Sequence, residues 1–124
     1  MTTQKPQIAI KRVYDEPEPQ DGARILVDRL WPRGISKERA HIDAWLKDLA
    51  PSNELRKWFG HEPEKFAEFR RRYGAELHSE EAQAALRQLE DKAKQGPLTL
   101  VFAAHDVEHN NAVVLREYLQ QALR

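Results

Sequence analysis

The sequence predicts an α/β fold, a single small domain with a short, mostly parallel sheet covered by helices. Three short apolar runs bounded by turn residues, at 7–14, 24–28 and 98–103, predict three strands. Apolar residues spaced three and four apart predict about five helices, most of them between the second and third strands. A length of 124 residues suits one domain. Because several helices separate strands two and three, we expect a right-handed parallel crossover between them.

Residues 1–6 are expected to form a loose tail before the first strand, which carries Ile8 and Ile10. The segment 15–22, D-E-P-E-P-Q-D-G, predicts a loop. The second strand has an unbroken apolar run, 25–27, as in a strand covered on both faces. The loop between these strands is short for the usual parallel crossover of about 10–12 residues or more. Length alone therefore favours an antiparallel pair, and their relative direction stays open.

The helices are predicted from apolar spacing and from residues that cap or end a helix. Ser36 is expected to cap a helix over 37–49 that ends before Pro51, with Ile42, Trp45, Leu46 and Leu49 on its apolar face. Ser52 is expected to cap a short helix that Gly60 ends. Further helices are expected over 63–74, 79–95 and 110–123.

Composition excludes several classes of function. Twenty basic and twenty acidic residues give zero net charge, so a chain-wide basic surface for nucleic acid is absent, although a local patch is possible. The lack of cysteine excludes disulfides, thiolate catalysis and zinc–thiolate sites. No apolar run approaches the roughly 20 residues of a membrane span, and no signal-peptide core is present. We expect a cytoplasmic protein that does not contact membranes.

The first candidate site follows the second strand. Parallel strands would bring the loops 28–36 and 104–111 to one edge of the sheet, where ligands bind in open α/β folds. Guanidinium groups bind phosphate or carboxylate oxygens, an indole can stack on a base, and a capped helix start offers N–H donors to an anion. In the alternative interpretation these residues form an ion pair, a core contact and a turn. The candidates are Asp28, Arg29, Trp31, Arg33 and Ser36.

Two further groups are weaker candidates. Ser52 could act as a nucleophile with His61 as its base and Arg56 as an anion holder, yet no G-x-S-x-G motif surrounds Ser52, so a capping role is favoured. His105 and His109 have a spacing seen in metal sites but lie in a predicted loop, and we expect no metal. Asp106, on the expected rim, is a candidate base.

Four segments together resemble the domain-of-unknown-function 488 family, in its short YeaO-like branch. They are K-R-V-Y-D at 11–15, L-V-D-R-L-W-P-R-G-I-S at 26–36, W-L-K-D-L-A-P-S-N-E-L-R-K-W-F-G-H at 45–61 and F-R-R-R-Y at 69–73. The resemblance covers about residues 8–119 and implies a Rossmann-like fold with parallel strands. It implies no established activity. Its signature positions are Lys11, Arg12, Tyr14, Asp28, Arg29, Trp31, Pro32, Arg33, Gly34, Ser36, Pro51, Ser52, Leu55, Arg56 and His61.

The chain departs from this family at the start of the last helix. Longer relatives are expected to have a Cys-His-Arg triplet there, where this sequence has Asn110, Asn111 and Ala112. Chemistry centred on that triplet is therefore not expected, although Asn110 and Asn111 could still cap the helix or offer amides to a ligand. Phe102 stands where those relatives often have a cysteine.

Three hypotheses follow. The chain could be an enzyme on a phosphate-bearing small molecule or nucleic acid, with Arg12, Arg29, Arg33 and Arg56 as anion contacts. It could instead be a non-catalytic module that recognises an anion or a protein partner, or these residues could be purely structural. We favour the first two without choosing between them, and no cofactor is expected.

Overall fold

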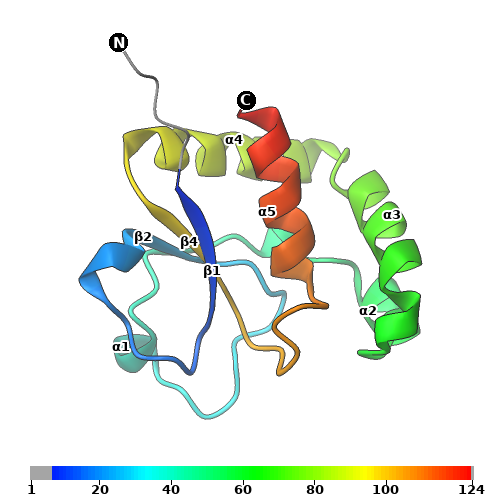
Figure 1. The fold of residues 1–124 in the computed structure, drawn as a ribbon, viewed down its shortest axis with the longest axis horizontal. Helices are drawn as coiled ribbons and strands as arrows, with labels where there is room; N and C mark the ends of the chain where they lie inside the picture. The colour runs from blue at the N-terminus through cyan, green and yellow to red at the C-terminus, as the bar shows by residue number, and fades with distance from the viewer. Residues whose placement is uncertain (1–6, 124) are drawn as a thin grey trace.

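Four parallel strands form the sheet of the computed structural model, which describes residues 7–123 (Figure 1). The α/β fold class predicted from the sequence is confirmed. In chain order the elements are β1 (Ile8–Arg12), η1 (Pro19–Asp21), β2 (Ala23–Leu26), α1 (Lys37–Ala40), β3 (Ala44–Trp45), η2 (Lys47–Leu49), α2 (Asn53–Phe59), η3 (Pro63–Lys65), α3 (Phe66–Glu76), α4 (Glu80–Gln95), β4 (Leu98–Phe102) and α5 (Asn111–Ala122), where η denotes a 3-10 turn.

The strand order is β1-β4-β2-β3, so β4 lies between the first two strands of the chain. Both β1 and β2 pair with β4 in parallel and start in register with Leu98. The antiparallel pairing favoured by loop length is therefore wrong. The link 13–22 carries only η1. It can span about 33 Å when extended, roughly twice the length of a five-residue strand, so no crossover helix is needed.

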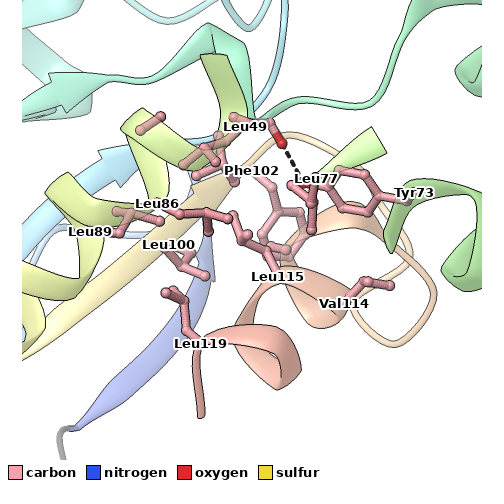
Figure 2. Packing of buried hydrophobic residues seen from close by; sticks show 14 of the residues in the cluster. Leu49, Tyr73, Leu77, Leu86, Leu89, Leu100, Phe102, Val114, Leu115 and Leu119 are labelled. Carbon is pink, nitrogen blue, oxygen red and sulfur yellow. Dashed lines mark hydrogen bonds between the residues drawn. The ribbon is translucent and has the colours of Figure 1, made fainter. Parts of the chain in front are cut away.

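The main hydrophobic core lies between one face of the sheet and the long helices. Alternate residues of β4, Leu98, Leu100 and Phe102, face α4 and α5 in this core. Figure 2 shows Leu86, Leu89, Leu115 and Leu119 packed around them. Tyr73 of α3 is fully buried and donates its hydroxyl to the Leu49 carbonyl, which satisfies a polar group that would otherwise be costly to bury.

A smaller cluster covers the opposite face of the sheet. Leu26 and Val101 lie there with Val13 and Ala40, under a layer from the segment that follows β2. Ile25, one position before Leu26, belongs to the main core. Because successive strand residues point to opposite faces, both faces of β2 are buried, as its unbroken apolar run predicted.

The helix predicted over 37–49 is wrong. Only α1, a single turn, forms before His41 adopts the left-handed region at φ 51°. The Asp43 carboxylate then accepts from the Arg24 N–H at 2.8 Å, and Ala44–Trp45 pair with β2 as a fourth strand. The apolar residues whose spacing predicted one helical face lie on both sides of the sheet. Ile42 and Trp45 pack in the smaller cluster, and Leu46 and Leu49 pack in the main core.

Helices form in the other four predicted segments, but the one predicted over 63–74 begins as the 3-10 turn η3 and continues past Gly74 to Glu76. Ser52, Ser79 and Asn110 each accept a hydrogen bond from a backbone N–H of the first turn that follows. Gly60 ends α2 in the left-handed region. In Figure 1, α4 runs along the top of the molecule, α3 lies at its right, and α1 lies at its lower left. Within residues 7–123, none of the helices has the length and apolar character needed to cross a bilayer.

Candidate functional site

A cleft of about 1030 Å³ opens at the carboxyl edge of the sheet, where the sequence predicted a site. Its residues come from the segments after β1, β2 and β4 and from α2 and α3. They are Tyr14, Asp28, Arg29, Leu30, Trp31, Pro32, Arg33, Pro51, Asn53, Arg56, Lys57, Phe59, His61, Phe69, Ala103, Ala104, His105, Asp106, His109, Asn110 and Asn111.

The path of the chain explains the cleft. The segment after β2 turns to the smaller cluster, with Trp31 and Ile35 packed there. The segment after the neighbouring strand β4 turns the other way, because α5 packs in the main core. Adjacent parallel strands whose continuations diverge leave a crevice beyond their carboxyl ends.

Asp28 lies on the wall between the two strand ends. One carboxylate oxygen accepts from the Ala103 N–H at 2.9 Å, and the other accepts from the Asn111 amide at 3.1 Å. Burial raises the pKa of Asp28, against the opposing effect of these hydrogen bonds and of the charges of Arg56 and His61. Through these hydrogen bonds Asp28, which follows β2, connects the end of β4 to the start of α5. The same residue also borders the cleft.

Two candidate arginines hold the walls of the cleft in place. Arg12 donates to the carbonyls of Ala104 at 2.9 Å and Ala103 at 3.3 Å, and it does not line the cleft. Arg29 does line it, but donates to Pro51 at 3.3 Å and, at a long 3.5 Å, to Ala50. Their guanidinium groups position backbone around the cleft, and Arg29 retains donors for a ligand.

Trp31 and Tyr14 are both anchored by polar contacts. The Trp31 indole N–H donates to the Ile35 carbonyl at 2.7 Å, and its ring meets Trp45 edge-on at 5.6 Å. The core role considered for Trp31 is thus present together with a position on the cleft wall. The Tyr14 hydroxyl donates to the Arg33 carbonyl at 2.8 Å, which ties the end of β1 to the Arg33 turn.

Besides the half-buried Arg29, three exposed cations face the cleft without a carboxylate partner among residues 7–123. They are Arg33, Arg56 and Lys57, all exposed and all on the cleft lining. The ion pairs among residues 7–123 involve none of them. The Arg56 guanidinium donates one hydrogen bond among the described residues, to the Asn53 side chain at 3.1 Å. His61 and His105 add imidazole groups to the same lining.

Ser52 and Ser36 lie outside the cleft lining. The Ser52 hydroxyl donates to a Glu76 oxygen at 2.6 Å and accepts from the Leu55 N–H at 3.1 Å. With Glu76 as its acceptor, it does not hydrogen-bond to His61. Ser36 caps α1, which is too short to form a substantial anion site.

The loop between β4 and α5 is stabilised by its own polar groups. Asp106 accepts from the backbone of Glu108 and His109 and pairs with the His109 ring at 2.9 Å. Hydrogen bonds from the Glu108 backbone, above all, lower the pKa of Asp106. Asn110 is buried and its amide donates to the Asp106 carbonyl, while the Asn111 amide donates to the Val27 carbonyl and to Asp28. Because their polar groups bind other groups of the protein, these side chains mainly determine the shape of the cleft and leave few donors for a ligand.

The cleft also contains residues that sequence reasoning missed as site residues. Lys57, Phe59 and Phe69 line it, and the two phenylalanine rings stack with centroids 4.5 Å apart. Lys57 follows Arg56 directly, which was an available signal. The phenylalanines were indistinguishable from ordinary core positions. In the part of the chain that the structure describes, no group of three or more possible ligands is arranged to hold a metal ion.

Comparison with known proteins identifies relatives along nearly the whole chain. A family profile described as "Inactive DUF488-N3 subclade" matches residues 7–124. The uncharacterised protein YeaO of Escherichia coli is 49% identical over 113 residues, covering 91% of this chain and 96% of YeaO. An uncharacterised protein of Mycobacterium tuberculosis is 44% identical over 113 residues, covering 91% of this chain and 93% of its own length. No solved structure matches significantly.

Proposed function

Because the chain belongs to the domain-of-unknown-function 488 family, whose name states no activity, we propose a function from the geometry of the cleft: it binds an anionic, phosphate-bearing ligand. One observation carries the proposal. Arg33, Arg56 and Lys57 converge on a cleft at the carboxyl ends of parallel strands, and none of them has a carboxylate partner among residues 7–123. Unpaired cations at this edge are a typical arrangement for holding phosphate.

Binding without turnover is the form of the proposal that the contacts support best. The one serine considered as a nucleophile donates its hydroxyl to Glu76 and lies off the cleft. Asn110 and Asn111 stand where longer relatives are expected to carry a histidine-containing triplet, and both amides make structural hydrogen bonds. The description of the matched subclade as inactive agrees with this proposal. We place the protein in the cytoplasm as part of the same proposal.

An enzyme acting on the same ligand is the second candidate. One observation favours it: Asp28 and His61 line the same cleft. Burial raises the pKa of Asp28, and the charge of His61 opposes this rise. A carboxyl group with a raised pKa can serve as a general acid or base.

The proposal is tested by thermal shift and calorimetry with phosphate, sugar phosphates, nucleotides and short oligonucleotides at fixed salt. A ligand that binds the folded state raises the melting temperature. We expect Arg33→Ala and Arg56→Ala to weaken the best ligand about tenfold each, the size of a charge-assisted hydrogen bond. Arg87→Ala, an exposed arginine of α4 outside the cleft, is the matched control and should bind normally.

Two results would contradict the proposal. One is binding that survives both cleft substitutions unchanged. The other is the absence of any shift across the panel at millimolar ligand. Release of inorganic phosphate from a bound ligand, lost in Asp28→Asn, would instead support the enzyme.

A further inference from the structure

The cleft is electrically polarised, and its polarity restricts the ligand beyond the need for a phosphate. Its exposed rim carries Arg33, Arg56 and Lys57. Its inner wall carries the largely buried carboxyl group of Asp28. A phosphate therefore gains at the rim and is repelled at the inner wall, so a ligand with negative charge along its whole length fits poorly.

Asp28 retains capacity to bind a ligand. Each of its oxygens accepts one hydrogen bond, from Ala103 and from Asn111. An ionised carboxylate has about four acceptor positions, so about two remain. The group that fills them must be a hydrogen-bond donor, because a carboxylate does not donate. The raised pKa of Asp28 agrees with a carboxyl group whose hydrogen bonds do not fully compensate for its burial.

Part of the cleft wall is aromatic and apolar. Phe59 and Phe69 are both buried and stacked on each other, and Trp31, Pro32 and Leu30 also line the cleft. The cleft volume, about 1030 Å³, lies at the upper end of the range for sites that take drug-sized ligands and far exceeds that of a phosphate ion. Aromatic side chains bind most favourably to surfaces that stack on them. This lining therefore favours a ligand with a flat ring over a ligand that presents mainly hydroxyl groups.

We propose that the cleft recognises a nucleotide with a single phosphate group and an amino-bearing base, its phosphate at Arg33, Arg56 and Lys57 and its amino edge at Asp28. The inference rests on the proposed function and adds the ligand class and an orientation. Carboxylates accept hydrogen bonds from the amino groups of bases in other nucleic-acid sites. In this arrangement Asp28 selects bases that carry an amino group, in addition to connecting the ends of β2 and β4.

The test compares matched ligands on the wild-type protein by calorimetry. Adenosine and guanosine monophosphates are compared with inosine monophosphate, cytidine with uridine monophosphate, and all with ribose 5-phosphate and inorganic phosphate. We expect at least one amino-bearing nucleotide to bind about tenfold more tightly than its counterpart without that amino group and than ribose 5-phosphate.

Two variants locate the effect. Asp28→Asn should remove the preference for the amino group while phosphate binding is retained or strengthened, since a negative charge is lost. Asp106→Asn removes the same charge from the same cleft, but the oxygens of Asp106 are engaged by its own loop. That variant should keep the preference. The ligand series on the wild-type protein decides the question even where a variant folds poorly.

The outcomes separate the two proposals. Equal affinity for nucleotides, ribose 5-phosphate and inorganic phosphate leaves the anion site standing and overturns the nucleotide. Equal affinity within each pair that differs in an amino group, or a preference that Asp28→Asn keeps, overturns the role of Asp28. Failure of every phosphate compound to bind overturns the anion site itself.

Discussion

At the scale of single residues, the tightest constraint on the backbone lies at Gly22, just before β2. Its φ of 65° is in the left-handed region, and a Cβ built there would lie 2.1 Å from the Pro97 carbonyl oxygen. That carbonyl accepts from the Ala23 N–H, so it cannot move without loss of the first hydrogen bond between the starts of β2 and β4. Glycine is required here by both backbone angle and space.

Gly22→Ala should destabilise the protein by more than the roughly 1 kcal/mol of a strained left-handed residue, because steric overlap is added to strain. The matched control is Gly74→Ala in α3, where a Cβ meets nothing within 4 Å and φ is not positive. That substitution should stabilise by about 0.5–1 kcal/mol through helix propensity. Urea unfolding measures both. Equal effects of the two substitutions would contradict the steric argument.

At the scale of elements, a buried arginine decides where α1 ends. Arg24 of β2 is 4% exposed and donates to the Ala40 carbonyl at 2.8 Å and to the His41 carbonyl at 3.1 Å. It also pairs with Asp21 at 2.7 Å. These bonds satisfy the last carbonyls of α1 and favour the left-handed turn at His41, which leads the chain into β3.

Arg24→Met keeps an unbranched apolar stem and removes these donors, leaving two carbonyls without partners. We expect a loss of about 2–4 kcal/mol in the free energy of unfolding, somewhat below the usual cost of breaking a buried pair because Lys11 still pairs with Asp21. Arg71→Met, an exposed arginine paired with Glu68 on α3, is the control and should change stability far less. Comparable losses in the two variants would show that Arg24 makes no special contribution.

At the scale of the whole molecule, stability should depend on pH through the carboxylate that joins the strand ends. Because burial raises the pKa of Asp28, the folded state binds more protons than the unfolded state between pH 3.8 and the folded pKa. The contribution of Asp28 is therefore full below that window and decreases as pH rises through it. Asp21 and Asp106 have lowered pKa values, so the stability that they contribute is lost as pH falls below 3.8 through their folded pKa values.

This effect is isolated by comparing the wild-type protein with Asp28→Asn, in which Asp21 and Asp106 are unchanged. The free energy of unfolding of the wild-type protein, minus that of the variant, should fall as pH rises from about 3.8 and then level off. Urea unfolding at half-unit steps from pH 3.5 to 8 measures the difference. A difference that stays flat or grows with pH would mean that burial does not raise the pKa of Asp28.

The same scale shows which parts of the candidate site were predictable. Residue type and position predicted that Asp28, Arg33 and Asp106 border one edge, because parallel strands end at a common edge, and all three line the cleft. That His61 lines the same cleft was not predicted from the strand ends. The sequence did not predict which arginines bind backbone carbonyls and which have no carboxylate partner. Arg12 and Arg24 bind backbone carbonyls, whereas Arg33 has no carboxylate partner among residues 7–123, and nothing in their local sequence distinguishes the three.

By itself the sequence determined the α/β class, four of the five helices with the caps at Ser52, Ser79 and Asn110, and the edge at which the cleft opens. These features depend on interactions within a few residues or on the common direction of strands. Only the tertiary structure decided that β4 lies between β1 and β2, that the helix ends at residue 40, and that residues 44–45 join the sheet. The reason is physical: Ile42, Trp45, Leu46 and Leu49 repeat with a helical period, but contacts from Arg24, distant in sequence, outweigh that local preference.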